Sequence, residues 1–163
     1  MEQNMSDNII TAIGGFKRVM VVRLKPGTDV LLGLEEACRK HGITNGVIVS
    51  GIGAVTRAAF ANPTLYPGRK QPYNYGETIV LEGGIGISGA SGVICHEENG
   101  DLSLHVHMSF SDERGDSYAG HLREGTRTMV TVDVVIAELD GVSMTRKFDS
   151  ELEVMLMSPE EVS

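Results

Sequence analysis

Apolar and polar residues alternate along most of this chain, which is the pattern of half-buried β-strands. Residues 28–42 instead place apolar side chains at helical spacing, with Thr28 as the expected N-cap and Gly42 as the expected end. The pattern therefore predicts an α+β fold: a mostly antiparallel β-sheet with one main helix packed on it. The alternation predicts strands over 16–26, 46–61, 77–88, 91–97, 101–110, 126–139 and 142–149.

Glycine and proline residues mark where the predicted strands bend or end. The glycines of 46–61 predict two short strands joined at a bend, although Gly51 and Gly53 could also let the backbone approach a ligand. Residues 62–75 hold three of the five prolines and show no regular period, which predicts a loop. The pair at 140–141, Asp-Gly, is typical of a hairpin turn, so the last predicted strand should return along the one before it.

The length of 163 residues suits one domain with its own core. We expect a single compact domain over 15–150, a flexible lead at 1–14 and a tail at 151–163. No apolar run is long enough to span a membrane, and the N-terminus lacks the features of a secretory signal. The two cysteines, Cys38 and Cys95, are expected to be buried small hydrophobic residues, and the protein is expected to be cytoplasmic.

The strand at 101–110 separates two kinds of side chain onto two faces, because successive strand residues point in opposite directions. One face receives Leu102, Leu104, Val106, Met108 and Phe110, and the other receives Ser103, His105, His107 and Ser109. Two imidazoles so placed can reach one metal ion, and His121 is the natural third ligand. Solvated histidines on a polar face remain the alternative. His41 and His96 lack such partners and are expected to be structural.

Charge argues against nucleic acid as a partner. Acidic residues outnumber lysine and arginine 22 to 14, for a formal net charge of −8. The sequence also lacks the Arg-Gly-Arg core with which an AT-hook reaches into the minor groove. Residues that could assist chemistry at a metal are not ranked by the sequence, and the catalytic residues stay unknown. The candidates are Arg57, Glu77, Glu82, Arg123 and Glu124.

Several motifs occur in an order that resembles the PPC domain family, also called DUF296. They are VVRLKPGTDVLLGLEEACRKHGI, GVIVSGIGAV and the LHVHMSFSD…GHL block, and the likeness covers about residues 15–149. The resemblance implies a compact α+β fold that forms a homotrimer, with a zinc-type ion on His105, His107 and His121. The fold is also similar to that of acetolactate decarboxylase, a metal enzyme with a His-x-His pair and a later histidine.

Three hypotheses follow. The leading hypothesis is that the chain is a small metal-binding protein whose divalent ion is expected to be zinc. That ion would bind a small carbonyl or carboxylate substrate if the protein is an enzyme, and the sequence does not decide whether it is one. The second is a DNA-binding or regulatory interaction module, because plant members of the resembled family bind AT-rich DNA. The third hypothesis is that the ion has only a structural role and holds the domain or the trimer together.

Overall fold

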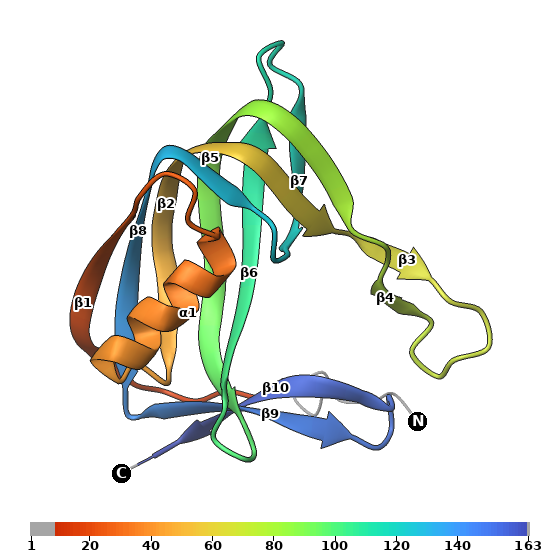
Figure 1. The fold of residues 1–163 in the computed structure, drawn as a ribbon. Helices are drawn as coiled ribbons and strands as arrows, with labels where there is room; N and C mark the ends of the chain where they lie inside the picture. The colour runs from red at the N-terminus through yellow and green to blue at the C-terminus, as the bar shows by residue number, and fades with distance from the viewer. Residues whose placement is uncertain (1–8, 163) are drawn as a thin grey trace.

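The computed structural model describes residues 9–162, so residues 1–8 of the expected N-terminal lead, and residue 163, lie outside the described part. Eight strands form one sheet in the order β1-β8-β2-β7-β6-β5-β9-β10, and β3 pairs only with β4 (Figure 1). The described residues form β1 (Gly15–Leu24), α1 (Val30–His41), β2 (Gly46–Ala61), β3 (Pro63–Leu65), β4 (Tyr73–Tyr75), β5 (Ile79–Glu97), β6 (Leu102–Ser111), β7 (Ser117–Leu122), β8 (Arg127–Asp140), β9 (Val142–Asp149) and β10 (Val154–Glu161).

The sheet curls because β2 pairs with three neighbours. This strand lies between β8 and β5, and its last residues, Phe60 and Ala61, pair with β7. Since β5 also pairs with β6, and β6 with β7, these four strands surround a common interior (Figure 1). The core holds side chains from these strands, from β8 and from α1, among them Leu34, Val55, Phe60, Ile85, Ile94, Val106, Phe110 and Ile136.

The fold class expected from the sequence is wrong. Strands contain 64% of the described residues and helix only 8%, so the protein is mostly β with one short helix, and it is not a main helix packed on a sheet. The large sheet is also mixed, because β5 and β9 pair in parallel at His96 and Glu97. The expectation failed because segments predicted as bends or loops continue or form strands: β2 and β5 run for 16 and 19 residues, and β3, β4 and β7 fill segments without a clear period.

Glycine keeps β2 continuous where a bend was expected. A Cβ on Gly53, whose φ is 148°, would lie 2.3 Å from the carbonyl oxygen of Thr131 in β8. A Cβ on Gly51 would lie 2.6 Å from that of Ala90 in β5. Both glycines therefore let neighbouring strands approach β2 closely, and neither ends the strand.

The expected hairpin between β8 and β9 does not form. Gly141 turns the chain with a φ of 74°, but β9 then pairs with β10 along its whole length and with the end of β5. The residues expected as a tail thus contain β10. A tight turn signal fixes the local bend, whereas the partner of the next strand depends on which sheet edge it meets.

The helix α1 closes part of the interior. Its N-cap is Asp29, one residue after the expected Thr28, and the Asp29 carboxylate accepts a hydrogen bond from the backbone of Leu32. Gly42 ends the helix in the left-handed conformation, as predicted. Both cysteines are buried free thiols. Within residues 9–162, no helix has the length and apolar character needed to cross a membrane.

Candidate metal centre

The two faces predicted for β6 are confirmed. Val106, Met108 and Phe110 are at most 2% exposed and belong to the core. His105 and His107 point away from the core, with His105 exposed and His107 half-buried. The β6 alternation therefore frees both imidazoles for contacts outside the apolar interior.

Strand pairing brings the third histidine beside these two. His121 of β7 lies directly opposite His107 of β6 in the antiparallel register, so both side chains stand on the same face. The preceding residue must be small: a Cβ on Gly120 would lie 2.7 Å from the ring of Phe60. Gly120 therefore lets β7 pack closely against the end of β2 while His121 projects toward β6.

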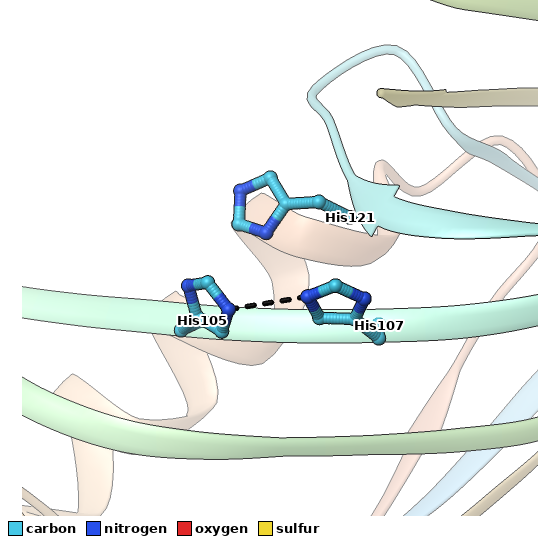
Figure 2. A group of neighbouring side chains, drawn as sticks. All are labelled: His105, His107 and His121. Carbon is cyan, nitrogen blue, oxygen red and sulfur yellow. Dashed lines mark hydrogen bonds between the residues drawn. The ribbon is translucent and has the colours of Figure 1, made fainter. Parts of the chain in front are cut away.

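The three imidazoles converge. Their candidate ligand nitrogens all lie within 4.8 Å of one another, and the Nε2 atoms of His105 and His107 are 3.1 Å apart. Figure 2 shows the ring of His121 above the other two, with one ring nitrogen facing them. Such a group could hold a metal ion. The His105, His107 and His121 set singled out in the sequence is thus brought together.

The electrostatics of the cluster keep two of its rings neutral. Burial lowers the pKa of His121 to about 4, and the neighbouring histidines and Arg123 act in the same direction. Burial and the adjacent His107 also lower the pKa of His105. In addition, Nδ1 of His121 is buried and has no hydrogen-bond partner within the described residues. Neutral imidazoles with free lone pairs are the form that binds a divalent ion.

Sequence reasoning missed Tyr75. It lies in β4, within the segment predicted as a loop, and its hydroxyl is 3.1 Å from Nε2 of His107. Its ring stacks on His121 with centroids 4.3 Å apart. Burial raises the pKa of Tyr75, while the nearby Arg123 opposes that shift. The available signal was compositional, since three of the four tyrosines fall within 62–75.

Of the five candidate helper residues, Arg123 contacts the centre through another residue: its guanidinium lies 5.5 Å from the centroid of the Tyr75 ring. Arg57 and Glu82 instead form an ion pair with each other, at 3.0 Å. Glu77 and Glu124 are exposed surface residues.

A pocket of about 710 Å³ adjoins the cluster at His105. His105 and Tyr75 line it on one side, and the apolar side chains of Val154–Met157 in β10 line it on another. Arg146 of β9 also faces the pocket, held by hydrogen bonds to Glu97 (2.8 Å) and Ser103 (3.3 Å). No local pattern marked Arg146, because its position depends on the unexpected pairing of β9 with β5.

The remaining histidines lie outside the cluster. His41 is exposed at the end of α1, and its backbone carbonyl accepts a hydrogen bond from Arg18. His96 pairs through Nε2 with the hydroxyl of Thr145, at 3.1 Å. Neither belongs to a group of three candidate ligands in the described residues.

Solved structures share this fold. A metal-containing protein from Archaeoglobus fulgidus is 24% identical, with a TM-score of 0.74 over 91% of this chain and 99% of that one. A plant- and prokaryote-conserved (PPC) protein from Pyrococcus horikoshii is also 24% identical, with a TM-score of 0.74 over 95% and 99% of the two chains. A proposed DNA-binding protein from Bacteroides thetaiotaomicron is 20% identical, with a TM-score of 0.70 over 89% and 96%.

Sequence comparison adds a longer relative and a family. The bifunctional protein GlmU of Synechococcus sp. (strain JA-3-3Ab) is 28% identical over 126 residues, which make up 76% of this chain but only 18% of that protein. This chain therefore spans less than a fifth of the length of that curated relative. The model of the Plants and Prokaryotes Conserved (PCC) domain matches residues 11–140. The PPC-type resemblance found in the motifs is thus confirmed, and the chain belongs to the Plants and Prokaryotes Conserved domain family.

Proposed function

We propose that this protein binds one divalent ion, zinc, through His105, His107 and His121. The observation that supports this is a convergence of three imidazoles within 4.8 Å in which a buried nitrogen has no partner among residues 9–162. Three histidine nitrogens form a known zinc ligand set that leaves a further coordination position. The metal-containing protein of the same fold from Archaeoglobus fulgidus adds support.

Metal analysis of protein purified without chelators tests the proposal. We expect about one zinc per chain in the wild type and close to none in His107→Ala, because two imidazoles hold the ion far less tightly than three. His41→Ala is the matched control, since His41 lies outside the cluster and its loss should leave the zinc content unchanged. A wild type that stays free of metal after zinc is added would contradict the proposal.

We further propose that the ion meets a small carboxylate or carbonyl ligand in the adjoining pocket. The pocket volume of about 710 Å³ is that of a small-molecule site. The guanidinium of Arg123 beside Tyr75 has no ion pair among the described residues, and this charge favours an anionic group at this point. Arg146 in the pocket wall is already paired with Glu97, and Glu153 also lines the pocket, so Arg146 offers direction through its remaining N–H groups more than net charge. When bound, zinc would supply Lewis-acid polarisation of a carbonyl. Arg146 would orient the carboxylate, and β10 would exclude water from an apolar substituent.

Calorimetric titration with pyruvate as the probe tests this ligand class. We expect binding heat from the zinc-loaded wild type, a loss of about tenfold in affinity for Arg146→Gln, and no heat from zinc-free protein. Lys147→Gln is the matched control, because Lys147 pairs with Glu160 and does not line the pocket. Nuclear magnetic resonance of the same mixture over hours reports whether the probe is converted. Equal affinity in the presence and absence of zinc would contradict the ligand proposal.

DNA binding is the competing function. Proteins of the same fold from Bacteroides thetaiotaomicron and Ralstonia eutropha are described as proposed DNA-binding proteins, although each is only 20% identical to this chain. The net charge of −8 opposes attraction to phosphate. We therefore expect no shift of an AT-rich duplex in a gel at low salt. Specific retention of that duplex would favour the DNA-binding function over the small-ligand function.

We also propose a homotrimer that assembles through the outer face of β1, β8 and β2. Val21 is 73% exposed there, and Val19 and Ile52 are about as accessible, at 60% and 58%. An exposed apolar face of this kind is typical of a subunit contact. Light scattering should give the mass of three chains for the wild type and a smaller mass for Val21→Asp. Leu32→Asp, on the exposed side of α1, is the control; a monomeric wild type would contradict the assembly.

A cytoplasmic location is part of the same proposal. The two cysteines are buried free thiols, which suits a reducing compartment. Cell fractionation with an antibody to the protein tests the location, and recovery in a membrane or secreted fraction would contradict it.

A further inference from the structure

Tyr75 places its hydroxyl against both histidines of β6. The oxygen lies 3.4 Å from Nε2 of His105 and 3.1 Å from Nε2 of His107, and those two nitrogens are 3.1 Å apart. The ring also stacks on His121, with an angle of 20° between the planes. The phenol of β4 is therefore in contact with all three rings of the cluster, although β4 belongs to a separate two-stranded ribbon.

Hydrogen bonding alone cannot satisfy these contacts. Each neutral ring nitrogen offers either one proton or one lone pair, so Nε2 of His105 and Nε2 of His107 can each make one good hydrogen bond. The hydroxyl can donate to one nitrogen and accept from the other, which accounts for two of the three short distances. The third short distance, between Nε2 of His105 and Nε2 of His107, then has no proton left to form a hydrogen bond.

A central cation satisfies all three contacts together. Ligand atoms bound at about 2.0–2.1 Å to a tetrahedral ion lie about 3.3–3.4 Å from one another. The three distances of 3.1, 3.4 and 3.1 Å, which join the Tyr75 oxygen and the Nε2 atoms of His105 and His107, come close to that spacing. The candidate nitrogen of His121 lies within 4.8 Å of those of the other two histidines. We propose that the Tyr75 oxygen is the fourth ligand of the ion held by His105, His107 and His121. The inference rests on the metal binding proposed above; as the oxygen binds, the phenol proton passes to bulk water.

Charge around Tyr75 favours this role. The guanidinium of Arg123 lies over the phenol ring, and no acidic side chain is paired with Arg123 among the described residues. A cation at this position offsets the negative charge of a metal-bound phenolate.

The ligand role also gives Tyr75 control over access to the ion. Tyr75 and His105 line the same pocket. A molecule in that pocket would share the ion with Tyr75 or take its place, and zinc tolerates four or five ligands. The β3–β4 ribbon would then hold the ion in a closed site until a ligand binds.

Copper(II) spectroscopy and zinc affinity together test the role. Phenolate bound to copper(II) gives a charge-transfer band in the visible region, which imidazole ligands alone do not give. We expect this band in the copper-loaded wild type and in Tyr73→Phe, and its loss in Tyr75→Phe. Competition with a chelator should show zinc affinity about tenfold lower for Tyr75→Phe and unchanged for Tyr73→Phe. Tyr73 is the matched control because it lies on the same strand but outside the histidine cluster.

The outcomes separate this inference from the metal proposal. Tyr75→Phe removes one oxygen atom, and melting of the metal-free variants checks that all of them fold alike. Metal bound with wild-type affinity by Tyr75→Phe, together with a wild type that lacks the band, would overturn the fourth ligand and leave the three-histidine site intact. A wild type that binds neither zinc nor copper overturns both.

Discussion

Two groups of polar side chains lie on this sheet, and they differ in how their hydrogen-bonding capacity is used. Glu138 of β8 is only 7% exposed, yet its carboxylate accepts hydrogen bonds from Lys17 and Arg18 of the neighbouring β1. At the histidine cluster, by contrast, the buried Nδ1 of His121 has no partner within residues 9–162. The first group is complete in the protein alone, and the second is not.

The contrast indicates what each group is for. A buried charge with its partners in place is tolerated by the fold, and removing one of the partners is what destabilises it. A buried donor or acceptor left without a partner costs stability. Nδ1 of His96 and Oγ1 of Thr128 are also buried without partners in the described part of the chain, so what sets the cluster apart is that the unpartnered nitrogen of His121 stands among three converging imidazoles. Charge points the same way. The negative charge of Glu138 is offset by Lys17 and Arg18, whereas the neutral imidazoles offer lone pairs to a cation. The histidine cluster is therefore expected to be completed from outside.

The largest expected effect is stabilisation by zinc. At a free zinc concentration about 100 times the dissociation constant, binding to the folded state alone raises the free energy of unfolding by about 2.7 kcal/mol. Urea denaturation with and without zinc measures this difference. His107→Ala should lose the response, and Glu138→Gln should keep it, because Glu138 lies in the group that is already complete. An equal response in His107→Ala would place the zinc elsewhere.

Loss of the Glu138 charge comes next. Glu138→Gln weakens the contacts with Lys17 and Arg18, and we expect the free energy of unfolding at pH 7 to fall by about 1–3 kcal/mol. Chemical denaturation of the metal-free proteins gives the value. Glu113→Gln is the control for the loss of a charge alone, because Glu113 is exposed and lies outside the hydrogen bonds and ion pairs found for the described residues. No change in Glu138→Gln would mean that the paired group adds nothing to stability.

The pH dependence of Glu138 sharpens that prediction. Burial raises the pKa of Glu138, but the hydrogen bonds and charges of Arg18 and Lys17 outweigh burial and hold it below its ordinary value of 4.5. The unfolded chain therefore takes up the proton at higher pH than the folded protein does. The stabilisation is present above about pH 4.5 and is lost as the pH falls through the folded pKa. The free energy of unfolding of Glu138→Gln should therefore fall less between about pH 4.5 and lower pH than that of the wild type.

The histidine cluster was largely predictable because it depends on short-range rules. A period of two fixes the face of β6 on which His105 and His107 stand. The nearby His121 needed only one strand pairing to join them. The same local rules placed α1 to within two residues at its start, where Asp29 took the capping role expected for Thr28.

The features that depend on distant pairing were not predictable. The hairpin signal at 140–141 predicted the turn but not the strand with which β9 pairs. Instead of returning along β8, β9 pairs with the end of β5, and this pairing places Arg146 at the pocket. Tyr75 reaches the histidines from a ribbon of two three-residue strands, too short for alternation to be recognised. The long strands β2 and β5 were divided because glycine signals a break locally, whereas here it permits close strand packing.

The smallest expected effect concerns the incomplete group itself. His121→Leu replaces a side chain whose buried nitrogen has no partner with an apolar one, so the desolvation cost of that nitrogen disappears. We expect the metal-free variant to be as stable as the metal-free wild type or more stable, by up to about 1 kcal/mol, while it loses the response to zinc. Urea denaturation in the presence of a chelator measures the first effect, and repetition with zinc measures the second. A metal-free His121→Leu that is less stable by more than about 1 kcal/mol would show that the contacts the ring already makes, such as its stacking on Tyr75, outweigh the cost of the unpartnered nitrogen. The contrast with Glu138 would then disappear.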